Sequence, residues 1–267
     1  MTDKSQIFRR GSTTYYFSSL FFPPDLKEKV FTLYAYVRTA DDFVDSVPQQ
    51  KDAFYAFVTE TWSAWERGSS KNSIISEFVA LAKEHAFERA WVEAFLSAME
   101  SDLSIHTYET FEDLERYMYG SAEVIGLMMA RLMKLPKEAE ETARLQGKAM
   151  QLINFIRDIK EDISLGRMYI PQADLARFGI TSNAIAKDMR LFTSLVTFEL
   201  NRYREIQHGA EKGYHFLPYR YRVPIRTASA MYEWTADCIE KDPLIVFEKK
   251  VKPSPWFVVI SLMKHLL

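Results

Sequence analysis

The sequence predicts an all-α protein folded as a single domain over residues 1–267. Long stretches place apolar residues at the three- and four-residue spacing of a helix, and almost none alternate with the period of two that strands show. Glycine is scarce, at 9 residues, and no linker rich in serine and glycine divides the chain. Hydrophobic residues make up 48% of the sequence, which excludes a disordered chain and leaves one helical core as the simplest arrangement.

Proline and glycine indicate where the individual helices begin and end. Pro23-Pro24-Asp25 is typical of a helix start, because proline fits the first turn and an acidic residue there meets the helix dipole. This helix is expected to run to Asp45, shortly before Pro48. Further helices are expected at 51–66, 73–86, 88–105, 111–134, 137–164, 182–212, 222–241 and 254–266, with a loop and a short helical turn over 167–178.

Charge and cysteine content exclude several classes of protein. The 34 Lys and Arg nearly balance the 36 Asp and Glu, so no basic excess indicates a nucleic-acid partner. The single cysteine, Cys238, cannot form an intrachain disulfide, which fits a reducing cytoplasm. The N-terminal segment has no apolar run typical of a signal peptide, and no run of 18 apolar residues predicts a membrane-spanning helix.

The C-terminal segment combines an apolar run with lysines and permits two interpretations. It contains Trp256–Ile260, then Leu262, Met263, Leu266 and Leu267, together with Lys249, Lys250, Lys252 and Lys264. Such a segment can be an amphipathic helix that lies on a membrane surface as a peripheral contact. It can equally be a last helix that closes the core.

A first carboxylate cluster lies near the end of the helix that begins at Pro23. Asp41 and Asp45 are four residues apart and therefore point to the same helix face. Arg38 precedes Asp41 by three residues on that side, and Tyr34 lies one turn further back. A single pair of this kind is common on exposed helix surfaces, so this cluster alone decides nothing.

A second cluster lies on a strongly apolar helix. Gln151, Asn154, Asp158 and Asp162 follow a spacing of 3, 4 and 4 and form one polar stripe. The remaining positions are filled with apolar residues, which indicates that the helix is largely buried: Leu152, Ile153, Phe155, Ile156 and Ile159. A buried stripe of amides and acids requires partners.

Divalent cations would make two such acidic faces compatible. Mg²⁺ binds oxygen ligands and is commonly held by one or two carboxylates together with substrate phosphates. The guanidinium groups of Arg38 and Arg157 can form bidentate hydrogen bonds with phosphate oxygens. Two acid pairs, each accompanied by an arginine and set among apolar residues, therefore predict a site for Mg²⁺ and a diphosphate.

The chain resembles the squalene/phytoene synthase family, the head-to-head isoprenyl diphosphate synthases, and the phytoene synthase branch most closely. The resemblance rests on YAYVRTADDFVD (34–45) and QLINFIRDIKEDISLGRMYIP (151–171), with support from YMYGSAEVIGLMM (117–129) and FLPYRYRVPIRTASAMYEW (216–234). It implies an isoprenoid-synthase-type helical bundle that encloses a central apolar cavity. Two departures are Gly11 in place of a histidine and Glu123 in a run of small residues.

The resemblance also implies roles for individual residues. The catalytic set is Asp41, Asp45, Asp158, Asp162, Tyr34 and Arg38. The metal ligands are Asp41, Asp45, Asn154, Asp158 and Asp162. The substrate-binding set is Tyr34, Arg38, Tyr119, Gln151, Arg157, Arg167 and Tyr232, with the N-terminal segment Gly11, Ser12, Thr13 and Thr14.

The implied reaction joins two molecules of geranylgeranyl diphosphate into phytoene for carotenoid biosynthesis. It needs about two or three Mg²⁺ ions, passes through a cyclopropylcarbinyl diphosphate and releases pyrophosphate. Squalene or dehydrosqualene from two farnesyl diphosphates is the alternative, with NADPH required only for squalene, and a non-catalytic helical assembly protein is a lesser one. Small Ser18 and Ser19 favour a longer tail, and tunnel-lining candidates are Leu127, Met128, Met129, Leu132 and Met133.

Overall fold

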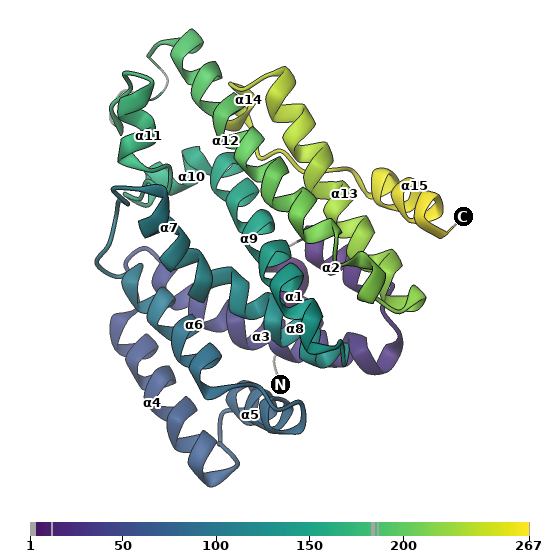
Figure 1. The fold of residues 1–267 in the computed structure, drawn as a ribbon. Helices are drawn as coiled ribbons and strands as arrows, with labels where there is room; N and C mark the ends of the chain where they lie inside the picture. The colour runs from purple at the N-terminus through teal and green to yellow at the C-terminus, as the bar shows by residue number, and fades with distance from the viewer. Residues whose placement is uncertain (1–3, 12, 183–184, 186, 267) are drawn as a thin grey trace.

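The computed structural model describes residues 4–11, 13–182, 185 and 187–266, and within these ranges it is all-α, as predicted. An isolated bridge between Thr107 and Met168 joins two loops, and no strand forms in the described ranges. Figure 1 shows α9 (Glu140–Arg157) running through the middle of the bundle. It packs against α8 (Val124–Leu132), α12 (Met189–Glu211) and α13 (Tyr219–Lys241).

The N-terminal half begins with two helices that the sequence did not predict, α1 (Lys4–Gly11) and α2 (Thr13–Ser19). The predicted helix follows as α3 (Pro24–Asp45), with Pro24 in its first turn and Asp25 beside the helix dipole. Three further predicted helices are present, and their bounds are α4 (Lys51–Arg67), α5 (Ser73–Glu84) and α6 (Arg89–Ser101). The Asn72 side chain accepts hydrogen bonds from two N–H groups at the start of α5.

The expected continuous helix over 111–134 is wrong. A π-helical turn, η1 (Tyr119–Glu123), separates α7 (Phe111–Met118) from α8. This turn packs tightly against α6, and a side chain at Gly120 would begin 2.3 Å from the carbonyl oxygen of Ala94. Single π turns insert an extra residue into a helix and occur often near functional sites. Here the turn changes which side chains of the following helix face inward.

The expected continuous helix over 137–164 is also wrong. It consists of a 3₁₀ turn η2 (Lys137–Ala139), α9 and a short α10 (Ile159–Ser164). The break lies at Asp158, whose backbone has φ −99° and ψ 13° and leaves the α-helical region. One acidic residue of the second cluster therefore lies at the junction of two helices.

The C-terminal half follows the predicted order with shifted boundaries. The short turn expected in 167–178 is α11 (Gln172–Arg177). The next helix, α12, begins later than expected because the Asp188 side chain accepts hydrogen bonds from the N–H groups of Arg190 and Leu191. The 3₁₀ turn η4 (Tyr214–Phe216) precedes α13, and α14 (Ile245–Glu248) was not expected.

The last helix, α15 (Pro255–Leu266), packs against α13 and α2. Val258 and Ser261 are buried, whereas Trp256, Ile260 and Met263 are exposed. One face of this helix therefore closes the core, and another presents apolar side chains to the outside. Within the described ranges, no helix is both long enough and apolar enough to cross a bilayer.

Candidate active site

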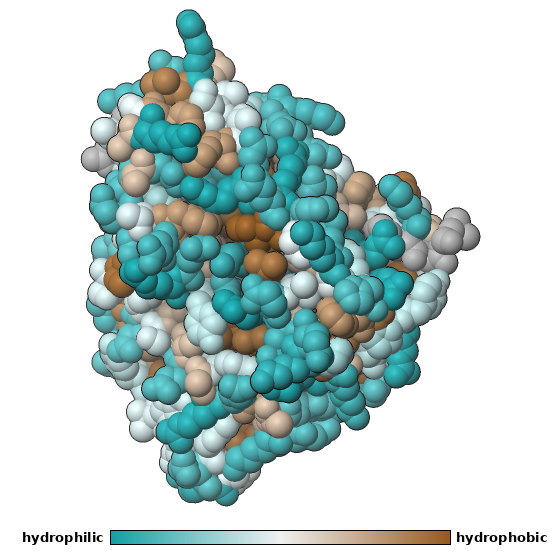
Figure 2. Space-filling view, in the orientation of Figure 1, coloured by the Kyte–Doolittle hydropathy of each residue, from teal (hydrophilic) through white to brown (hydrophobic). Residues whose placement is uncertain are grey.

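A cavity of about 570 Å³ lies inside the bundle, a volume within the range typical of sites for small molecules. Its walls come from α1–α3, α6–α10, α12, α13 and the segment after α14. Figure 2 shows apolar surface near the middle of one face, over α9, with polar surface around it. Much of the lining is apolar, including Phe22, Val30, Leu33, Val37, Phe95, Met99, Ile125, Met129, Met133 and Ile225.

The four aspartates predicted from the sequence all line this cavity. Asp41 and Asp45 come from the last turns of α3, and Asp158 and Asp162 come from the α9–α10 junction. Their charges interact across the cavity, because Asp45 contributes to a raised pKa at Asp162 on the opposite wall. The two clusters, more than a hundred residues apart in the chain, therefore form one acidic site.

Burial and mutual repulsion strongly perturb the carboxyl groups. Burial, followed by the charge of Asp45, raises the pKa of Asp41 to about 8. Burial, followed by the charge of Asp158, raises the pKa of Asp162 well above its ordinary value. At Asp158 burial also opposes ionisation, but hydrogen bonds and charge from Arg157 overcome it and lower the pKa. A cation in this cavity would stabilise the ionised forms of these carboxyl groups.

The surroundings of the Asn154 side chain indicate whether the acidic site can hold a metal ion. Its Oδ1 is buried without a hydrogen-bond partner and lies one helical turn before Asp158 in the cavity wall. A buried oxygen without a partner requires an explanation, and a cation is one of the few that satisfy it. In the described part of the chain, no three His, Cys, Asp or Glu side chains gather as a metal site. Mg²⁺ does not require such a group, because phosphates and water complete its shell.

Three arginines surround the acidic site. Arg38 Nη1 donates to Asp41 Oδ2 at 2.6 Å, and Arg157 Nε donates to Asp158 Oδ1 at 2.9 Å. Arg167, only 5% exposed, donates from Nη1 to Asp45 Oδ1 at 2.6 Å and from Nη2 to the carbonyl oxygen of Val44 at 2.8 Å. The loop after α10 is thereby tied to the end of α3.

Other predicted substrate-binding side chains also reach the cavity. Tyr34, Gln151 and Tyr232 line it from α3, α9 and α13. The ring of Tyr34 stacks on Phe8 with centroids 3.8 Å apart, and burial raises the pKa of its hydroxyl. The phenol of Tyr34 is therefore neutral and held in one orientation, and it can donate a hydrogen bond to an anion.

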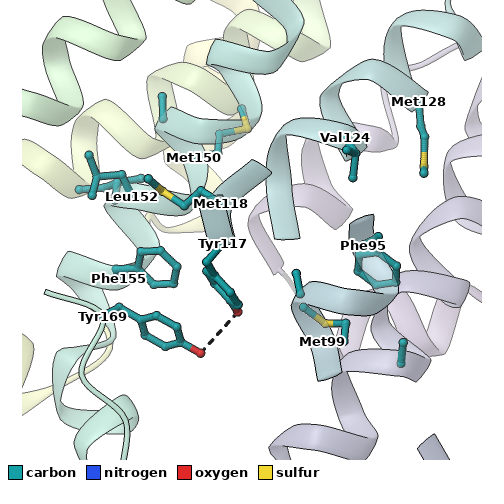
Figure 3. Packing of buried hydrophobic residues seen from close by; sticks show 14 of the residues in the cluster. Phe95, Met99, Tyr117, Met118, Val124, Met128, Met150, Leu152, Phe155 and Tyr169 are labelled. Carbon is teal, nitrogen blue, oxygen red and sulfur yellow. Dashed lines mark hydrogen bonds between the residues drawn. The ribbon is translucent and has the colours of Figure 1, made fainter. Parts of the chain in front are cut away.

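A second group of lining residues was not predicted from the sequence. Asp102, at the end of α6, is 2% exposed and accepts hydrogen bonds from the hydroxyls of Tyr117 at 2.8 Å and Tyr169 at 2.9 Å. Burial raises the pKa of Asp102 to about 6, and Arg167 limits the rise. Figure 3 shows Phe155 beside Tyr169, with ring centroids 4.2 Å apart, and Tyr117 directed toward Tyr169.

Two lysines after α14 were also missed as site residues. Lys250 Nζ lies 3.4 Å from Asp158 Oδ1 and also contacts Glu161, and both Lys250 and Lys252 line the cavity. From the sequence, both lysines are expected to belong to the C-terminal amphipathic segment. No spacing rule connects them with Asp158, because the contact depends on how the chain returns after α13.

Comparisons with known proteins identify the family of the chain. The family model for squalene/phytoene synthase matches residues 8–257. The chain belongs to the squalene/phytoene synthase family. It is 28% identical to a 15-cis-phytoene synthase of Synechococcus elongatus, covering 98% of this chain and 91% of that protein. It is 29% identical to a phytoene synthase of Rhodobacter capsulatus, covering 85% and 69%.

Solved structures of similar fold carry related names. A dehydrosqualene synthase in complex with a ligand superposes with a TM-score of 0.91 at 22% identity, covering 98% of this chain and 94% of that one. The squalene synthase HpnC from Alicyclobacillus acidocaldarius gives a TM-score of 0.79 at 23% identity, covering 89% and 92%. These likenesses establish the squalene/phytoene synthase fold for the chain.

Not every residue that was predicted to bind the substrate lines the cavity in the structure. Tyr119 is 37% exposed, lies outside the lining and stacks under Arg144, 5.5 Å away. The π turn begins at Tyr119, and Tyr117, two residues earlier, is the tyrosine that lines the cavity. Glu123 is buried behind the wall and pairs with Lys148 at 2.8 Å.

Predictions for the N-terminal segment and for the tail region have mixed outcomes. Ser12 lies outside the described residues, and Gly11, Thr13 and Thr14 are described only through the backbone of α1 and α2. Ser18 and Ser19 line the cavity. Of the five tunnel candidates on α8 and at its C-cap, Met129 and Met133 line it, whereas the other three are packed in the core: Leu127, Met128 and Leu132.

Proposed function

We propose that the protein is a Mg²⁺-dependent prenyltransferase that joins two geranylgeranyl diphosphates head to head into phytoene. The reaction proceeds through a cyclopropylcarbinyl diphosphate and releases pyrophosphate. One observation carries the proposal: the four aspartates and the unpartnered Asn154 oxygen line a single, largely apolar cavity. The relatives named phytoene synthase support geranylgeranyl diphosphate as the substrate.

The acidic site would hold the metal ions through Asp41, Asp45, Asn154, Asp158 and Asp162. Bound Mg²⁺ supplies electrostatic stabilisation of the negative charge that develops on the departing diphosphate. Arg38 and Arg157 stand beside the aspartates and are positioned to bind phosphate oxygens. Tyr34, Gln151 and Tyr232 add hydrogen-bonding groups from three different helices.

The apolar part of the cavity protects a cationic intermediate. An allylic cation reacts with water unless the site excludes it, and a closed apolar chamber does so. Phe155, Tyr117 and Tyr169 line the same cavity as the aspartates, and aromatic rings attract a cation. Asp102 holds both tyrosine hydroxyls and so fixes the orientation of this wall.

A second candidate is the condensation of two farnesyl diphosphates into squalene or dehydrosqualene. It is favoured by the names of the structures that superpose on this chain. Squalene formation would also require NADPH as a reductant. The two candidates share the same acidic site and differ in tail length and in the final step.

An assay of the isolated protein tests this proposal. The protein is incubated with farnesyl or geranylgeranyl diphosphate, with and without Mg²⁺ and NADPH, and the hydrocarbon is identified by its mass. We expect phytoene from geranylgeranyl diphosphate, dependent on Mg²⁺ and independent of NADPH. Product from farnesyl diphosphate alone would support the second candidate, and no pyrophosphate release from either would refute both.

We further propose that α15 places the enzyme against a membrane with anionic lipids. Trp256, Ile260 and Met263 are exposed at a spacing of 4 and 3, which sets them on one helix face, and Lys264 is exposed next to them. Figure 2 shows apolar surface at the edge where α15 lies. An apolar stripe flanked by lysines favours the headgroup region of a bilayer.

Replacement of two exposed residues of α15 tests the membrane contact. We expect the double variant Trp256→Ser and Ile260→Ser to lose most of its co-sedimentation with vesicles containing phosphatidylglycerol, because the buried apolar area drives the binding. Its melting temperature should change little, since both side chains are exposed. Tyr55→Ser, at an exposed position on α4, is the matched control and should bind as wild type does. Equal binding by all three proteins would contradict the proposed contact.

A further inference from the structure

At the turn between α8 and α9 the cavity is lined by Met133, Leu135 and Ala139, and this part is called the far end of the cavity. These two helices pack against each other so closely that a side chain at Gly126 would begin 2.1 Å from the carbonyl oxygen of Ala143. A side chain at Gly147 would begin 2.4 Å from the carbonyl oxygen of Ala122. These two contacts show that α9 runs antiparallel to α8 and the preceding η1. The step from Ala122 to Gly126 is four residues forward, and the matching step from Gly147 to Ala143 is four residues backward on α9.

This register gives the depth at which each lining residue lies. From the pair Gly126–Ala143, three or four further residues in this register place Met129 beside the first turn of α9, near Ala139. Met133 then lies beyond that turn, at the far end. Fifteen residues separate Asn154 from Ala139, which at 1.5 Å per helical residue is about 22 Å of depth. A tail whose diphosphate is held at the aspartates therefore points along α9 toward the two methionines.

The far end is apolar and is lined by adaptable side chains. Met133 is buried and Met129 is half-buried, and both line the cavity with Ala139 and Leu135. Lys134 adopts φ +55°, which reverses the chain direction so that the N–H of Leu135 donates to the carbonyl oxygen of Ala130 at 3.0 Å. Methionine side chains are unbranched and flexible, so they fill the remaining space without rigid walls.

We propose that Met129 and Met133 determine the longest prenyl tail that the enzyme accepts. This inference rests on the proposed function, because it concerns how the same cavity selects among prenyl diphosphates. Prenyl tails differ in length by whole five-carbon units, and the two methionines occupy the space that an additional unit would need. A single methylene in an apolar pocket changes specificity by about 10- to 200-fold, so a misfit of five carbons is strongly discriminated.

Substitutions that shorten or deepen the cavity test this inference. Met129→Trp and Met133→Trp fill the far end, and each should raise the ratio of kcat/KM for farnesyl over geranylgeranyl diphosphate by at least about 10-fold. Met133→Ala should instead allow turnover of geranylfarnesyl diphosphate, which is one five-carbon unit longer. The ratio for two substrates does not depend on how much of a variant is folded, so a partly unstable variant remains informative.

Met128→Ala is the matched control on the same helix. Met128 is 1% exposed, belongs to the core cluster and does not line the cavity, and Figure 3 shows it on the same side of α8 as Val124. We expect Met128→Ala to lower the melting temperature and leave the substrate ratio unchanged. If the wild type is active and neither Met133 substitution changes the substrate ratio of kcat/KM, the inference is wrong. It is also wrong if Met128→Ala changes that ratio equally, and in both cases the proposed function stands. A wild type that releases pyrophosphate from none of these diphosphates would overturn the proposed function as well.

Discussion

Asp41→Asn and Asp158→Asn are each expected to reduce kcat/KM by a factor of about 10² to 10³ or more, since removal of one preorganised electrostatic group has that effect on catalysis. Asparagine keeps the size of the side chain and removes the negative charge that would bind a cation. Burial, followed by the charge of Asp45, raises the pKa of Asp41 to about 8, so the fold disfavours its ionised form despite the ion pair with Arg38, and neutralising the side chain removes that cost. Asp41→Asn should therefore maintain or increase stability while activity is lost, whereas Asp158→Asn should lower stability, because it removes the charge that pairs with Arg157 and Lys250.

The measurement combines pyrophosphate release with far-UV circular dichroism and thermal unfolding. Asp42→Asn is the matched control, because Asp42 is next to Asp41, carries the same charge and does not line the cavity. It should retain most of the activity. Turnover near the wild-type level in Asp41→Asn or Asp158→Asn would contradict the assignment of the acidic site.

Asp102→Leu is expected to have the second-largest effect, on both stability and turnover. Leucine has a similar volume but leaves the buried hydroxyls of Tyr117 and Tyr169 without their acceptor. Each unsatisfied buried group costs about 1–3 kcal/mol, so the free energy of unfolding should fall by several kcal/mol. We expect kcat to fall at least about 10-fold in the folded fraction, because the aromatic wall beside the aspartates loses its fixed orientation.

A graded series separates the catalytic effect from the structural one. Asp102→Asn keeps one acceptor oxygen and should lie between wild type and Asp102→Leu in both melting temperature and kcat. Tyr36→Phe is the control, since Tyr36 is buried on the opposite side of α3 and its hydroxyl donates to Thr61 at 3.1 Å. It should lower stability without lowering kcat. If kcat per folded molecule is unchanged in Asp102→Leu, the orienting role of Asp102 is wrong.

Much of the site was predictable because it depends on the spacing of residues along single helices. Asp41 and Asp45 share a helix face, as do Gln151 and Asn154, and these relations follow from 3.6 residues per turn without any knowledge of the fold. The buried character of α9 was equally clear from the apolar residues around its polar stripe. The sequence therefore determined the all-α class, the main helices and the two acidic clusters.

Tertiary packing decided the remaining features. Gly120 in the π turn at Tyr119–Glu123 allows the close approach of α6, and Tyr117, which precedes this turn, lines the cavity whereas Tyr119 does not. Asp102 joins the site only because α6 ends beside Tyr169, and Lys250 only because the chain returns to Asp158 after α13. Spacing along a helix specifies which side chains share a face, but contacts between distant segments depend on how closely backbones approach one another. That distance depends on the packing of all the helices together, so no single segment of the sequence contains it.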